Sequence, residues 1–120
     1  MKHNIFVYGS LKRGFNNHSL LANQQFVAHA STQSRYKLYY LGSFPGMIEV
    51  TENGCSIEGE IWCVDSTSLV HLDQLEDIAH GMYARVPIHL QPPHNTLNVE
   101  GYLYLLSIAG RRDCGTSWTE

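Results

Sequence analysis

The sequence predicts an α+β domain in which about six or seven short strands form a small mixed sheet that curls toward a β-barrel, with flanking helices. Short apolar runs rich in β-branched and aromatic residues recur between Gly, Pro and Asn turns, whereas only two segments carry helical signals. The 120 residues suffice for one compact core and are too few for two ordinary domains. A single domain over residues 1–120 is therefore expected, with room for a small ligand at the mouth of the barrel.

The first half of the chain indicates a series of strands. Ile5–Tyr8 is an apolar run that a Gly-Ser pair interrupts, so a strand is expected to enter a tight turn there. Further short strands are expected at residues 25–30, 36–41, 47–50 and 57–64. Turns that contain Gly42, Gly46 and Gly54 separate these runs, which predicts an antiparallel meander or a curled sheet.

Two segments are expected to be helical. Asp65–Ile78 is the clearer one, because N-cap side chains open it and Gly81 can take the left-handed position after its end. Asn16 and Asn17 are candidate caps for about two turns of helix over Ser19–Ala22.

The last third of the chain predicts two more strands and a tail. Tyr83–Leu90 and Leu97–Leu106 are apolar, β-rich runs on either side of the loop Pro92–Asn95. Arg111–Glu120 is polar and contains Gly, so it is expected to be a tail or a strap on the surface.

Composition excludes several classes of protein. The net charge is −3 and the pI is about 6.1, and adjacent basic residues occur only at Lys12-Arg13 and Arg111-Arg112. The sequence therefore lacks the cluster of positive charge that binds a nucleic acid. No apolar run approaches the roughly 18 to 20 residues that cross a bilayer, so no membrane partner is expected. The N-terminus enters a strand-like run at once, without a signal sequence, which predicts a cytoplasmic protein.

Cysteine and histidine spacing indicates neither disulfides nor metal. The 3 cysteines, Cys55, Cys63 and Cys114, are odd in number and have no CxxC spacing. The 7 histidines form neither HxH nor HExxH. No metal site is therefore predicted.

One acid lies on the apolar side of the expected main helix. In steps of about 100° from Leu69, Leu72 falls at about 300° and Glu76 at about 340°, between the two leucines. A buried carboxylate is costly unless it is paired or protonated, and the negative end of the helix dipole adds to that cost. The pKa of Glu76 is therefore expected to rise toward neutrality, where general acid–base catalysis works best.

A structural role for Glu76 is the alternative, in which it pairs with Arg85 or another cation and ties the helix to the sheet. Asp73 and Asp77 fall at about 40° and 80°, at the edge of the apolar stripe or outside it. Both are expected to be ordinary surface acids. Asp73 stays a weaker candidate for the catalytic role, because its angle on the helix is close to that of Glu76.

The turn after the first strand is the second candidate site. A strand that ends at Tyr8-Gly9-Ser10-Leu11 and runs toward a helix can present several backbone N–H groups to one carboxylate or phosphate. The spacing of Gly9 and Gly14 is that of a phosphate loop, but the Lys and Ser or Thr of that motif are absent. Ser10 as a nucleophile has no recognisable base.

Four short motifs lie in order along the chain, from about Lys2 to Leu106. They are Phe6–Leu11, Phe44-Pro45-Gly46, Gly59-Glu60-Ile61-Trp62, and Leu72-Asp73 with Glu76, followed by Tyr83-Ala84-Arg85. Together they resemble the γ-glutamylcyclotransferase-like family, and more narrowly its γ-glutamylamine cyclotransferase (AIG2-like) branch.

The resemblance implies a mixed β-barrel with flanking helices and a cavity at its mouth. It implies that Tyr8, Gly9, Ser10 and Leu11 hold the α-carboxylate of a γ-glutamyl substrate and that Glu76 is the catalytic acid/base. The implied reaction is attack of the substrate's α-amine on its γ-carbonyl, which releases 5-oxoproline and an amine or amino acid without a cofactor. Tyr104, in the last core strand, is a candidate substrate contact. The implied molecule is a monomer or a weak dimer.

The residue types suit this chemistry, but two other functions stay open. The α-amine must lose a proton before it attacks and the leaving amine must gain one, which a single carboxylate of raised pKa can do. Ring closure is intramolecular, so holding both ends of the substrate supplies a large effective molarity. The alternatives are a non-catalytic module that binds a small ligand through the same carboxylate-binding loop, and other amide or ester chemistry in the same pocket.

Overall fold

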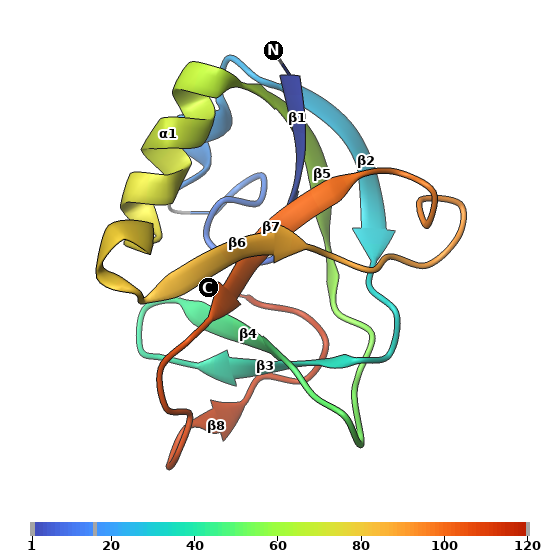
Figure 1. Cartoon of the computed structure of the whole chain (residues 1–120), viewed down its shortest axis with the longest axis vertical. Coiled ribbons are helices and arrows are strands. Elements are labelled where there is room, and N and C mark those ends of the chain that lie inside the picture. The colour runs from blue at the N-terminus through green and yellow to red at the C-terminus, as the bar shows by residue number, and fades with distance from the viewer. Residues whose placement is uncertain (1, 16, 120) are drawn as a thin grey trace.

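The computed structural model describes residues 2–15 and 17–119, which form two β-sheets, one α-helix and two 3₁₀ turns (Figure 1). The larger sheet contains, in spatial order, β2 (Gln25–Ser31), β5 (Glu58–Asp65), β1 (Lys2–Val7), β7 (Val99–Tyr104) and β6 (Tyr83–Pro87). The smaller sheet contains β4 (Pro45–Glu49), β3 (Tyr36–Tyr40) and β8 (Arg112–Asp113). The helical elements are η1 (His18–Leu21), α1 (Ser66–Leu75) and η2 (Ile78–His80).

The α+β class is confirmed, but the barrel is not. Within residues 2–15 and 17–119 the strands form two separate sheets and no closed ring of hydrogen-bonded strands. Helix α1 lies along one side of the larger sheet, and the smaller sheet lies below the larger one in the view of Figure 1. No helix in this part of the chain is long and apolar enough to cross a membrane.

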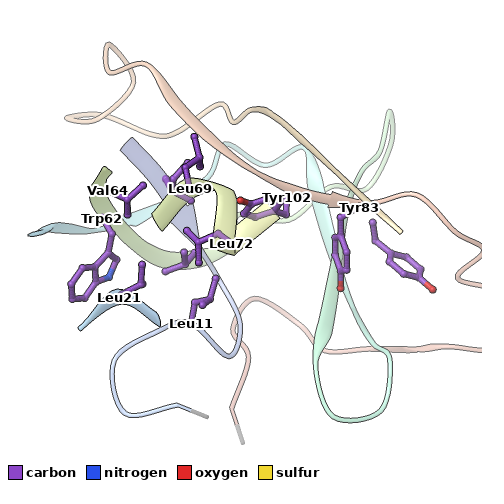
Figure 2. Close-up of a cluster of buried hydrophobic side chains, with 11 residues drawn as sticks. Leu11, Leu21, Trp62, Val64, Leu69, Leu72, Tyr83 and Tyr102 are labelled. Atoms are coloured by element: carbon purple, nitrogen blue, oxygen red, sulfur yellow. The ribbon is translucent and has the colours of Figure 1, made fainter. Parts of the chain in front are cut away.

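Strand β1 is central and is buried on both faces. Its side chains alternate, so Ile5 and Val7 join one apolar cluster while Phe6 and the following Tyr8 join another. The first cluster is closed by Leu69 of α1, together with Leu72 (Figure 2). The second contains side chains of β3 and β4, so the helix and the smaller sheet pack on opposite faces of β1.

Strand pairing differs from the expected meander. β2 pairs antiparallel with β5 rather than with β3, and β5 pairs antiparallel with β1. β3 and β4 form a separate hairpin, closed by a hydrogen bond from Leu41 N to Phe44 O at 3.0 Å. β1 and β7 are parallel, a pairing that needs a crossover connection and that local sequence patterns therefore do not indicate.

Both helical predictions need correction at their ends. Asp65 caps α1 by accepting a hydrogen bond from Ser68 N at 2.7 Å, as its residue type predicts. The α-helix ends at Leu75 rather than Ile78, because Asp77 takes left-handed backbone angles with φ 55°. The separate turn η2 follows and ends at His80, and Gly81 after it takes the left-handed position.

The first helix is also shorter than expected. It is the single 3₁₀ turn η1, and Asn17 at its N-terminus makes no side-chain cap. The other candidate cap, Asn16, lies outside the described residues.

The C-terminal segment is part of the fold rather than a tail. Its residues Arg112 and Asp113 form β8, which pairs with β3. Further along, Thr116 O accepts a hydrogen bond from Glu58 N at 2.8 Å, and Trp118 is only 4% exposed. Burial of this large side chain explains why a polar segment returns to the core.

Candidate active site

The structure contains a cavity of about 310 Å³ where the end of β1, the end of α1 and the starts of β4 and β6 meet. Both sequence candidates lie in its wall: the residues Tyr8–Leu11, called the Tyr8–Leu11 loop below, and Glu76. The rest of the wall comes from separate elements and consists of Phe6, Val7, Asn17, Ser43, Phe44, Pro45, Leu75, Met82, Tyr83 and Tyr102. The fold thus brings together two sites that lie far apart in the sequence.

Hydrogen bonds to neighbouring residues fix the Tyr8–Leu11 loop, and three of its backbone N–H groups have no acceptor among the described residues. The N–H groups of Gly9, Ser10 and Leu11 donate to no other group in the described part of the chain. The loop closes by a hydrogen bond from Lys12 N to Gly9 O at 3.1 Å. Arg13 N donates to the Glu60 carboxylate at 3.1 Å, which fixes the segment that follows. Unpaired backbone donors in a hollow are a site for an anion.

Gly9 is required by close packing. A Cβ atom at this position would lie 2.9 Å from the Pro45 side chain, so a larger residue would push β4 away from the loop. Tyr8 secures the same junction, because its hydroxyl donates to Tyr102 O at 2.6 Å and accepts from Met47 N at 3.3 Å. The loop is therefore rigidly placed against β4 and β7.

Glu76 is the C-cap residue of α1, and no other described group pairs with its carboxyl. Burial raises the pKa of Glu76 from 4.5 to about 7. The helical wheel predicts this inward position, whereas Leu75, the residue before it, is 41% exposed. A carboxyl that titrates near neutrality in a pocket can both accept and donate a proton.

The ion pair of the structural alternative does not form, because no cation of the described residues pairs with Glu76 and Arg85 has other partners. The Arg85 guanidinium donates to the Asp73 carboxylate at 3.0 Å and 3.3 Å, and to Glu100 at 2.5 Å. Asp73 also accepts a hydrogen bond from the Tyr102 hydroxyl at 2.7 Å. Asp73 is therefore a structural link from α1 to β6 and β7, not the ordinary surface acid that the wheel predicts.

The tyrosines near Glu76 are all engaged. The Tyr83 hydroxyl donates to Pro45 O at 2.8 Å, and the hydroxyls of Tyr8 and Tyr102 have the partners given above. Burial raises the pKa of Tyr8, Tyr83 and Tyr102. Among the described residues of the wall, Glu76 is the group with a pKa near neutrality.

Tyr104 lies behind the wall. It is 8% exposed, packs edge-on against Tyr83 with ring centroids 5.3 Å apart, and is not among the described residues that line the cavity. The tyrosines that line it from β6 and β7 are Tyr83 and Tyr102. Alternation along β7 places Tyr102 and Tyr104 on the same face, so the sequence alone does not separate them.

Several wall residues carry no functional signal in the sequence. The sequence predicts Asn17 as a helix cap, but its side-chain amide donates to Ser10 Oγ at 2.8 Å instead. Met82 lies in none of the sequence motifs. Phe44 is singled out only as part of the Phe44-Pro45-Gly46 motif. Across residues 2–15 and 17–119 no group of three or more His, Cys, Asp or Glu side chains could hold a metal ion.

Comparison with known proteins identifies the family. The model of the family described as "Gamma-glutamyl cyclotransferase, AIG2-like" matches residues 5–120. The chain belongs to this family.

Relatives of the cyclotransferase family share the sequence and the fold. The gamma-glutamylcyclotransferase family protein YtfP of Escherichia coli strain K12 is 40% identical over 81 residues, which are 68% of this chain and 67% of that protein. Gamma-glutamylaminecyclotransferase C of Danio rerio is 35% identical over 96 residues, 74% of this chain and 62% of the relative. The crystal structure of a uropathogenic E. coli-specific protein superposes with a TM-score of 0.82 and 28% identity over 98% of this chain and 93% of that one.

The curated relatives are matched over part of their length. The matched stretch is 65% of a Vibrio cholerae relative and 57% of an Arabidopsis thaliana relative. The chain therefore spans less than two thirds of these proteins.

Proposed function

We propose that the protein is a γ-glutamyl(amine) cyclotransferase in which Glu76 is the general acid/base and the Tyr8–Leu11 loop holds the substrate. One observation carries the proposal: the Glu76 carboxyl, unpaired among the described residues and with a pKa of about 7, lines the same small cavity as Gly9, Ser10 and Leu11, whose backbone N–H groups donate to no described group. Membership of the cyclotransferase family supports the reaction class.

The loop binds the anionic part of the substrate. The N–H groups of Gly9, Ser10 and Leu11 donate to the α-carboxylate of the γ-glutamyl group, which is a charge-assisted and therefore strong interaction. Because the loop is fixed against β4 and β7, little entropy is lost when the ligand binds. The γ-carbonyl is then held within reach of the α-amine, and the intramolecular attack gains a high effective molarity.

Glu76 moves the proton. Its carboxylate accepts a proton from the α-ammonium, and the free amine attacks the γ-carbonyl carbon to form the ring C–N bond. The Glu76 carboxylic acid returns that proton to the leaving nitrogen as the amide C–N bond breaks. The second proton that the ring nitrogen loses reaches the leaving amine through solvent, so the products are 5-oxoproline and an ammonium ion. No step requires a cofactor.

Location and assembly stay predictions from the sequence. A cytoplasmic location is expected, and a monomer or weak dimer is the expected unit.

The test measures 5-oxoproline release from a panel of γ-glutamyl compounds by mass spectrometry. Glu76→Gln is expected to lower kcat at least about 100-fold, the usual contribution of general acid–base catalysis, with little change in substrate binding. Glu52→Gln is the matched control, because Glu52 is exposed in the loop between β4 and β5 and is expected to keep full activity. Absence of product from the wild type, with a thermal shift caused by a panel compound, would instead indicate the non-catalytic binding module.

A further inference from the structure

Asn17 and Ser10 are joined by two hydrogen bonds beside the cavity. The backbone N–H of Asn17 donates to Ser10 O at 2.8 Å, and the Asn17 side chain Nδ2 donates to Ser10 Oγ, also at 2.8 Å. Both residues are half-buried and line the cavity. Asn17 stands at the N-terminus of η1 but does not cap it, so its side chain serves Ser10 rather than the turn.

The direction of this bond decides what the Ser10 hydroxyl can do. A hydroxyl has one proton to donate and two lone pairs to accept with. Since the Asn17 amide occupies a lone pair, the Ser10 proton is not used in that contact. No group in the described ranges 2–15 and 17–119 accepts this proton, so it is free for an acceptor in the cavity.

The same wall already carries unpaired donors. Gly9, Ser10 and Leu11 line the cavity, and their N–H groups have no acceptor within residues 2–15 and 17–119. A hydroxyl held as a donor among them adds a further hydrogen bond to the same anion. Without Asn17 the hydroxyl would rotate freely and would pay entropy to donate.

We propose that Asn17 is a positioning residue that holds the Ser10 hydroxyl as a hydrogen-bond donor to the carboxylate of the bound γ-glutamyl group. The inference rests on the proposed function for the identity of the ligand. It adds a role for Asn17 and a direction for the Ser10 hydroxyl. Asn17 acts on the substrate through Ser10.

The test is a double-mutant cycle on ligand affinity in the Glu76→Gln background, which prevents turnover. The ligand is γ-glutamylethylamide and the measurement is titration calorimetry. Ser10→Ala and Asn17→Ala are each expected to raise Kd about 10-fold, the low end for a hydrogen bond to a charged group. The double variant is expected to bind no more weakly than Ser10→Ala alone. Unchanged affinity in Asn17→Ala, or losses that multiply to about 100-fold in the double variant, would overturn the inference.

A second measurement separates positioning from a merely structural role. The backbone amide resonances of Gly9 and Leu11 in the ligand-free variants are expected to stay at their parent positions, because the loop is also held by the Asn17 backbone and by Glu60. Large shifts of both resonances in Asn17→Ala would show that the loop itself has moved and would overturn the positioning role.

Asn17→Asp keeps the size of the side chain and reverses the bond, since a carboxylate accepts the Ser10 proton. It is expected to weaken binding at least as much as Asn17→Ala, and parent-like affinity would contradict the inference. A parent protein that does not bind γ-glutamylethylamide at all would remove the proposed function together with this inference. Loss of the Asn17 effect alone would leave the proposed function standing.

Discussion

Glu76 stands at the position where α1 stops, and its properties follow from that position. The preceding turns of the helix place it on the side of Leu72, which is fully buried, so the carboxyl is carried toward the core. The left-handed residue Asp77 then turns the chain away, and the carboxyl is left at the wall of the cavity with no cation from residues 2–15 or 17–119 beside it. Burial without a partner is the reason for its raised pKa.

The same burial predicts a cost in stability that depends on pH. The pKa of Glu76 is about 7 in the folded protein and 4.5 is its ordinary value, so the folded state binds this proton more tightly. The cost is therefore absent below about pH 4.5, grows as the pH rises, and is complete above about pH 7. Glu76→Gln is expected to be more stable than the wild type by about 3 kcal/mol at pH 8 and nearly equal to it at pH 4.

Urea unfolding at both pH values measures this difference. Glu52→Gln removes the same type of charge from the exposed loop between β4 and β5, and its effect is expected to stay within about 0.5 kcal/mol at either pH. A Glu76→Gln protein that is no more stable than the wild type at pH 8 would show that the carboxyl is solvated or paired.

At the scale of elements, one link fastens α1 to the larger sheet. Arg85 of β6 donates two hydrogen bonds to Asp73 of α1, and Tyr102 of β7 donates a third. The Asp73 side chain is 26% exposed and that of Arg85 is 27% exposed, so the pair is shielded from solvent in part. The link holds the end of the helix, and with it Glu76, at a fixed distance from the cavity wall.

Loss of this link is expected to destabilise the fold. Asp73→Ala leaves the Tyr102 hydroxyl without its acceptor and the guanidinium with Glu100 alone, which is expected to lower the free energy of unfolding by about 1–3 kcal/mol. Gln74→Ala, on the exposed side of the same helix, is the control and is expected to change it by less than about 0.5 kcal/mol. Equal denaturant midpoints for the two variants would contradict a structural role for Asp73.

Local patterns predict the elements well and their partners poorly. Apolar, β-rich runs predict the strands β1 and β5, and the helical period predicts the inward position of Glu76. These patterns do not predict the pairing of β2 with β5, because register is decided by which apolar faces meet in the core. The two-residue strand β8 has no signal of its own and exists because it pairs with β3. The pairing of Arg85 with Asp73 is also not predicted by local patterns, because it depends on how the helix packs on the sheet.

At the scale of the whole molecule, the cavity wall bears on the leaving amine. The wall as described contains no Lys, Arg or His, and its apolar members include Phe44, Leu75 and Met82. A leaving amino acid would bring a second carboxylate to this wall without a cation to pair with it. The proposed enzyme is therefore expected to prefer γ-glutamyl amides of uncharged amines.

A pair of substrates of similar size tests this preference. The kcat/KM for γ-glutamylethylamide is expected to exceed that for γ-glutamylglycine by about 10-fold or more, which corresponds to about 1.4 kcal/mol. The rate of 5-oxoproline formation gives both values. Equal or reversed values would mean that a cation reaches the leaving group from outside the described wall.

The pH dependence of 5-oxoproline release tests the central claim, that Glu76 is the acid/base, most directly. The wild-type kcat/KM is expected to rise with pH along a limb centred at about pH 7, where the Glu76 carboxyl loses its proton. Glu76→Gln is expected to lose this limb together with most of its activity, while Glu52→Gln keeps both. A wild-type profile that is flat between about pH 6 and 8, or a limb that persists in Glu76→Gln, would contradict the assignment of Glu76.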